Sequence, residues 1–189
     1  MSTKPGQLHF SNWQETTSSG TILPRGTSAQ LSKFFNQNPD YIHGMIVFDY
    51  FVGNNDRKRD NLVLRTDGKL ALIDQGNSLL YYKREGCLYG AERLRRMELD
   101  PDAIFDQPYH FIDYLNDSDL VKKWCEKIKQ IPDFIIISLI ENLPELENID
   151  DNLKESSIDF LLNRREYLYT HIISSCNFTS LYRKEGKNE

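Results

Sequence analysis

Apolar and polar positions divide this chain into a polar start, an apolar centre and a second half with helical spacing. Residues 1–30 are rich in Gly, Ser, Thr and Pro and lack apolar periodicity, which predicts an irregular arm. A helix is expected from about residue 28 to 35, ending at the polar run 36–39. Residues 40–52 are apolar around most of a helical surface, so this segment is expected to be a buried core helix.

A β-hairpin is expected next. Two short apolar runs, residues 62–65 and 70–73, flank the dipeptide Asp67-Gly68. Asp-Gly favours the left-handed backbone of a tight two-residue turn, so the pattern is typical of paired antiparallel strands. Gly53 is expected to end the preceding helix, because glycine adopts the left-handed conformation at helix ends without strain. The predicted order is therefore helix, polar loop, hairpin and an acidic turn at Asp74.

The second half of the chain predicts helices and a polar tail. The helices are expected at residues 90–98, 117–130, 132–142 and 151–174. Together with the hairpin they give an α+β fold that is mainly helical. Three segments are expected: an arm at 1–30, a main lobe at 31–176 and a polar tail at 177–189.

Composition narrows the class of protein. The net charge of -5 over 189 residues argues against a nucleic-acid partner, since duplex affinity usually comes from a basic surface. The three cysteines, Cys87, Cys125 and Cys176, are widely spaced, which favours reduced thiols in a cytoplasmic protein. The first residues are polar and the longest apolar run is too short to span a bilayer. We therefore expect a cytoplasmic location and neither a nucleic-acid nor a membrane partner.

The polar loop between the helix and the hairpin carries the candidate chemistry. It places Asp56 five residues before Asn61, and Asp74 follows Asn61 by thirteen residues. Phosphoryl transfer needs a carboxylate that orients the attacking hydroxyl and metal ions that bridge phosphate oxygens. Magnesium prefers hard oxygen ligands and keeps several waters, so one carboxylate and one amide suffice. The spacing predicts Asp56 as the catalytic base, with Asn61 and Asp74 as Mg²⁺ ligands.

Two further residues are expected to support this loop. Asp49 is a charged residue in an apolar helix, so it needs a partner and is expected to anchor the loop that follows. Arg57 is expected to orient the loop through a carboxylate such as Asp49. An alternative remains that Asn-Asn-Asp is ordinary turn chemistry and that Asp74 caps a turn. The apolar helix before the loop and the hairpin after it argue against coincidence.

Residues 46–76 resemble the catalytic core of HipA-like kinases, which are relatives of the phosphatidylinositol kinases and, more distantly, of protein kinases. That group has an apolar helix, a pattern close to G-N-x-D-R-H-x-x-N, a short hairpin and an acidic metal-binding turn. The matching positions are Gly53, Asn54, Asp56, Arg57, Asn61 and Asp74. The resemblance implies a kinase-like C-terminal lobe, ATP and Mg²⁺ as cofactors, a protein Ser or Thr as acceptor, and supporting roles for Asn54 and Arg57.

The sequence departs from that family at two places. Lys58 stands where the family usually has His, and either substitutes for it or pairs with a phosphate or with Asp74. Only about 40 residues precede the core helix, without a strand run or a Gly-rich loop, so the N-terminal lobe is expected to be largely missing and no nucleotide-binding residue is assigned. Three interpretations follow: a compact kinase whose arm at 16–28 closes over ATP, half of a split kinase completed by a partner chain, or a pseudokinase that serves as an interaction module.

Overall fold

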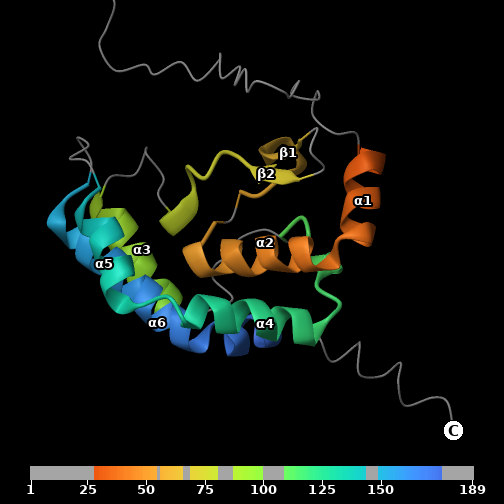
Figure 1. Cartoon of the computed structure of the whole chain (residues 1–189). Helices are drawn as coiled ribbons and strands as arrows, with labels where there is room; N and C mark the ends of the chain where they lie inside the picture. The colour runs from red at the N-terminus through yellow and green to blue at the C-terminus, as the bar shows by residue number, and fades with distance from the viewer. Residues whose placement is uncertain are drawn as a thin grey trace, which may run out of the picture.

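The fold is mainly helical. The computed structural model describes residues 28–54, 56–65, 69–80, 87–99, 109–143 and 149–175. Within these ranges the only strands form one antiparallel pair. Figure 1 shows α2 in the middle of the molecule, with the strand pair on one side and α4 and α6 on the other. The expected mainly helical α+β fold is therefore confirmed.

The elements follow the predicted order. The helices are α1 (Ser28–Gln37), α2 (Pro39–Val52), α3 (Cys87–Leu99), α4 (Ser118–Lys129), α5 (Asp133–Glu141) and α6 (Asp151–Ser175). The strands are β1 (Leu62–Leu64) and β2 (Leu70–Leu72), and single 3₁₀ turns occur at η2 (Arg59–Asn61), η3 (Ser78–Leu80) and η5 (Ile112–Tyr114). Residues 1–27, the Asp67-Gly68 dipeptide and the tail 177–189 lie outside the described residues. Within the described residues, no helix is long and apolar enough to cross a membrane.

The first helix differs from its expected end. It begins at Ser28 as expected, so residues 28–30 of the expected arm are helical, but it continues to Gln37 instead of ending near residue 35. The reason for the later end is Asn38, whose Nδ2 donates to the Phe34 carbonyl at 2.9 Å and whose backbone N–H donates to the Phe35 carbonyl at 3.2 Å. These bonds satisfy carbonyls that a helix end leaves open.

Helix α2 lies at the core of the molecule, as its apolar pattern predicted, and packs against α4. A Cβ at Gly44 would lie 2.5 Å from the Trp124 ring, so only glycine permits this approach. The Trp124 Nε1 donates to the Asp40 carbonyl at 3.0 Å. The fully buried His43 accepts the Asp117 backbone N–H on its Nε2 at 3.2 Å, so its Nδ1 carries the proton toward the Pro39 carbonyl.

The hairpin places the acidic turn beside the polar loop. Strands β1 and β2 pair antiparallel with Leu62 opposite Leu72, and the Ile73 backbone N–H donates to the Asn61 carbonyl at 3.0 Å. This last bond continues the pairing by one step beyond the strands. Because Asn61 precedes β1 and Asp74 follows β2, the antiparallel register makes the two neighbours in space. Gly53 ends α2 in the left-handed region at φ 65°, which turns the chain into the loop.

Candidate functional site

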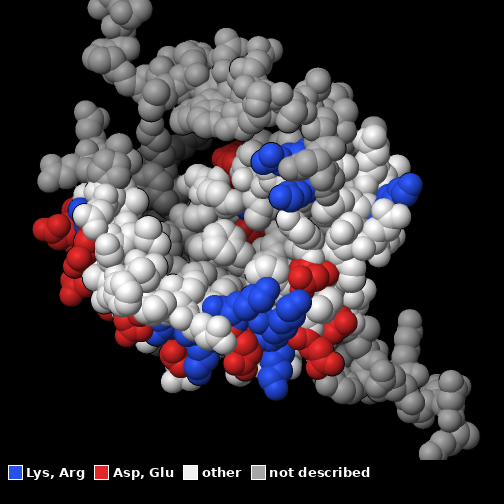
Figure 2. Space-filling view, viewed as in Figure 1, with Lys and Arg blue, Asp and Glu red and all other residues white. Residues whose placement is uncertain are grey.

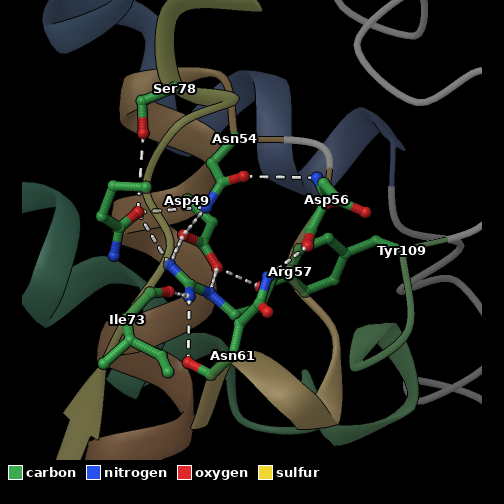
Figure 3. Close-up of polar contacts among 9 residues, drawn as sticks. Asp49, Asn54, Asp56, Arg57, Asn61, Ile73, Ser78 and Tyr109 are labelled. Atoms are coloured by element: carbon green, nitrogen blue, oxygen red, sulfur yellow. Dashed lines mark hydrogen bonds and ion pairs between the residues drawn. The ribbon is translucent and has the colours of Figure 1, made fainter. Parts of the chain in front are cut away.

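Arg57 lies at the centre of the polar cluster drawn in Figure 3. Its side chain is fully buried, and so is that of Asp49 on α2. The Arg57 Nε donates to Asp49 Oδ2 and its Nη2 donates to Asp49 Oδ1, each at 2.9 Å. A planar guanidinium matches a carboxylate in this two-pronged geometry, which adds direction as well as energy. The contact expected between Arg57 and Asp49 is present.

The remaining donors of Arg57 hold the acidic turn. Its Nη1 donates to the Ile73 carbonyl at 2.9 Å and to the Asn61 carbonyl at 3.4 Å, while Nη2 also donates to Gln75 Oε1 at 2.8 Å. Ile73 and Gln75 are the two chain neighbours of Asp74. Asp74 itself has φ 55°, a left-handed conformation that costs an L-residue roughly 1–2 kcal/mol. Arg57 therefore holds both neighbours of a strained residue, Ile73 through its backbone carbonyl and Gln75 through its side chain.

Asn54 joins the loop to the turn. Its Nδ2 donates to Asp49 Oδ1 and to Gln75 Oε1, both at 3.1 Å, and its Oδ1 accepts the Asp56 backbone N–H at 3.2 Å. The side chain is fully buried, so these bonds replace water. Asn54 thus fixes the backbone at Asp56 while it contacts the acidic turn.

Sequence reasoning missed two members of the cluster, Gln75 and Tyr109. Gln75 accepts from Asn54 and Arg57, but a glutamine between Asp and Gly gives no signal of that role. The Tyr109 hydroxyl donates to Asp49 Oδ2 at 2.5 Å, across sixty residues of sequence. Burial, followed by the charge of Asp49, raises the pKa of Tyr109 well above its usual value. Asp49 therefore accepts from Arg57, Asn54 and Tyr109.

Replacing Tyr109 with Phe is expected to lower the free energy of unfolding by about 1.5–3 kcal/mol at neutral pH, because a bond to a charged acceptor is lost. The native chain keeps the Tyr109 proton above pH 10, where the unfolded chain releases it. The unfolded state then binds fewer protons, so wild-type stability falls as pH rises above that value. Urea denaturation on both sides of pH 10 should show the gap between wild type and Tyr109→Phe narrowing with pH. An unchanged gap would contradict this assignment.

The three predicted reactive residues lie around this cluster. Asn61 is buried, and its Nδ2 donates to the Asp56 carbonyl at 3.0 Å, so the nitrogen end of the amide is committed and the oxygen end can serve as a metal ligand. The Asp56 side chain is 43% exposed. Asp74 is exposed at the end of the hairpin. The structure thus presents two accessible carboxylates and one oriented amide from two adjoining segments.

Lys58 pairs with Asp56, whereas a pair with Asp74 was one of the alternatives that the sequence offered. Its Nζ lies 3.2 Å from Asp56 Oδ2, with both side chains nearly half exposed. The loop bends so that the two side chains, two residues apart, reach each other locally. Exposed pairs of this kind contribute about 0–1 kcal/mol, so the ammonium can leave the carboxylate at little cost. Asp56 therefore stays available to a hydroxyl.

The donor set fits a magnesium ion bound with a nucleotide. Among the described residues, no three His, Cys, Asp or Glu side chains gather closely enough to hold a metal by themselves. Magnesium usually takes one or two carboxylates and completes its shell with water and phosphate oxygens. Asp74 and the Asn61 amide supply oxygen ligands of that kind.

Comparison with known proteins identifies the family. The family model for phosphatidylinositol 3- and 4-kinase matches residues 26–131, a segment that contains α2, the loop, the hairpin and the acidic turn. No curated protein and no solved structure matches the chain significantly. The expected kinase-like catalytic family is confirmed, while the narrower resemblance to HipA-like kinases stays a prediction. Because the match spans more than half of the 189 residues, the chain belongs to the phosphatidylinositol 3- and 4-kinase family.

Proposed function

We propose that this chain is a phosphotransferase that moves the γ-phosphoryl group of ATP to a hydroxyl group in the presence of Mg²⁺. The observation that carries the proposal is the Arg57 clamp, which holds the loop of Asp56 and Asn61 against the turn of Asp74. Positioning and electrostatic stabilisation provide most of the catalysis in phosphoryl transfer. A rigid support beneath three oxygen-bearing side chains suits that need.

Each of the three residues has a distinct role in the proposal. Asp56 accepts the proton of the attacking hydroxyl, and its exposure leaves room for an acceptor molecule. Asn61 and Asp74 would hold Mg²⁺, which neutralises charge on the phosphate oxygens when bound. Arg57, Asn54 and Asp49 support the loop without contacting the substrate.

The acceptor we favour is a protein Ser or Thr, by the resemblance to HipA-like kinases. The net charge of -5 disfavours attraction to an anionic membrane surface, which supports a protein substrate. The second candidate is the hydroxyl of a phosphatidylinositol headgroup, and the family match favours it. A cytoplasmic location belongs to the proposal, and the buried free thiol of Cys125 supports it, with a pKa raised to about 12 by burial.

Two alternatives concern what covers the nucleotide. Within the described residues the strands form a single hairpin, and the sequence offers no Gly-rich loop for the phosphates. A partner chain that supplies an N-terminal lobe would complete the site in a split kinase. A pseudokinase would instead use the same scaffold as a binding module. Both alternatives predict weak or absent turnover by the chain alone.

Nucleotide titration of the full chain by calorimetry tests the proposal. We expect a non-hydrolysable ATP analogue to bind with Mg²⁺, and we expect Asp74→Asn to weaken this binding at least tenfold, or about 1.4 kcal/mol. The matched control is Asp159→Asn, which removes an exposed carboxylate from α6 and should leave binding unchanged. Absence of binding by the chain, even with candidate partners added, would contradict the proposal. Binding restored by a partner would select the split kinase.

Labelled phosphate then separates the acceptors. The chain is incubated with γ-labelled ATP and Mg²⁺ together with Ser/Thr peptides, or with neutral vesicles that contain phosphatidylinositol. Label in peptides or in the chain itself supports a protein kinase, and label in the lipid supports the second candidate. Nucleotide binding without label in any acceptor would identify a pseudokinase and overturn the catalytic proposal.

A further inference from the structure

Helix α5 carries apolar residues on two faces, and only one face is buried. Ile136 and Ile140 are buried toward the core and α6. The other face forms what we call the α5 strip, whose side chains are 66%, 38%, 66% and 37% exposed. These residues are Phe134, Ile135, Leu139 and Leu143. Ile135 and Leu139 are four residues apart, which places them on one face of the helix, and Leu143 follows just beyond the end of α5 at Glu141. Exposed apolar patches of this kind mark interaction sites more often than scattered apolar residues do.

The α5 strip leads into a cavity of about 230 Å³ between η3, the end of α5 and the start of α6. Leu143 belongs to both the strip and the cavity wall. The other apolar lining residues are Leu79, Ile140, Ile149 and Leu153. Pockets for drug-sized ligands are roughly 300–1,000 Å³, so this smaller cavity suits a single apolar side chain. The strip and the cavity together make one continuous apolar surface.

Acidic side chains lie at both ends of α5 and around the start of α6. They are Asp133, Glu141, Asp150, Asp151 and Glu155, all exposed. Asp133 pairs with Arg165, and Lys154 lies in the cavity wall with its Nζ 3.4 Å from the Glu141 carbonyl. With these two basic residues counted, the net charge of the named side chains around the surface is still negative. Figure 2 shows the white surface over α5 with red side chains along its outer edge. Such a rim repels the anionic surface of a membrane and attracts Lys and Arg.

We propose that the α5 strip and its cavity are a docking surface for a basic peptide segment of a partner protein. One apolar side chain of the segment enters the cavity, further apolar side chains cover Phe134 and Leu139, and flanking Lys or Arg face the acidic rim. An amphipathic segment in an apolar groove is a recurrent recognition mode. Gly76 and Ser78, which follow the acidic turn at Asp74, also line the cavity, so the docked segment lies next to the candidate site.

Selection from a random twelve-residue peptide library displayed on phage tests this surface. The full chain serves as bait, and the same chain with Leu139→Glu serves for counter-selection. Leu139 is an exposed position, so the variant keeps the fold. Selected peptides are expected to carry two or three large apolar residues and a net positive charge. As synthetic peptides they should lose at least tenfold in affinity for Leu139→Glu, and also for Glu155→Lys. Tyr167→Glu, at an exposed aromatic residue of α6, is the control and should bind as wild type.

Other results would overturn the docking proposal. Selected peptides that bind Leu139→Glu as well as wild type would show that this surface does not select basic segments. Enrichment of acidic peptides would show the same. Sedimentation with phosphatidylcholine vesicles, with or without phosphatidylserine, that is lost in Leu139→Glu would assign the strip to a membrane. A dimer in light scattering that Leu139→Glu dissociates would assign it to a second copy of the chain.

Discussion

Replacing Arg57 with Met is expected to lower the free energy of unfolding by about 3–5 kcal/mol, since removal of one partner leaves the other charge buried and unpaired. Asp49 would keep only Asn54 and Tyr109 as donors, in a position without solvent contact. The carbonyl of Ile73 and the Oε1 of Gln75 would lose the same guanidinium. Urea denaturation followed by circular dichroism measures the loss as a lower midpoint at constant slope.

Lys123→Met is the matched control for Arg57→Met. Lys123 pairs with Asp40 at 2.8 Å, but both side chains are about half exposed. Removal of an exposed pair costs about 0–1 kcal/mol, so the two substitutions should differ severalfold although each removes one cation from one ion pair. Arg57→Lys keeps the charge but not the forked set of donors. Its loss of unfolding free energy should lie between those of Arg57→Met and Lys123→Met. A loss below about 1 kcal/mol in Arg57→Met would refute the central role of the clamp.

The scaffold of the site was largely readable from the sequence because its signals are local. Apolar residues all around 40–52 indicated a buried helix, and Asp-Gly between two apolar runs indicated the hairpin. A charged residue in an apolar helix needs a partner, so Asp49 was expected to anchor the loop, and Arg57 was expected to orient the loop through a carboxylate such as Asp49. Each of these inferences used residues within about twenty positions of one another.

The parts that sequence could not provide depend on distant or specific side-chain contacts. Tyr109 reaches Asp49 from sixty residues away, and no periodicity marks a tyrosine as a donor to a buried carboxylate. Asn38 extends α1 because its side chain donates a hydrogen bond to the Phe34 carbonyl. This bond outweighs the general tendency of asparagine to end a helix. Lys58 pairs with Asp56 and not with Asp74 because the loop brings the side chains of residues 56 and 58 together. Residue propensities do not predict which of two nearby side chains a residue will contact.

Replacing Asp56 with Asn is expected to lower kcat by roughly 10²–10⁴-fold, the usual contribution of a positioned general base. The effect should be equal in kcat and kcat/KM, because the proton is accepted only in the transition state. The fold should be unaffected: Asn54 and Asn61 hold the backbone of residue 56, and its side chain is 43% exposed with Lys58 as partner. Transfer of label from γ-labelled ATP to the acceptor that the labelling experiment identifies measures the change.

Asp60→Asn gives the sharpest comparison, because it removes a carboxylate from the same loop at an exposed position four residues later. It should leave kcat within about fivefold of wild type, since loss of one exposed charge changes interaction energies by less than about 1 kcal/mol. Calorimetry should show that Asp56→Asn still binds the ATP analogue with Mg²⁺, because Asn61 and Asp74 are unchanged. An Asp56→Asn chain that turns over at the wild-type rate would remove Asp56 as the base. Equal losses in both variants would point to the loop's net charge instead of one positioned carboxylate.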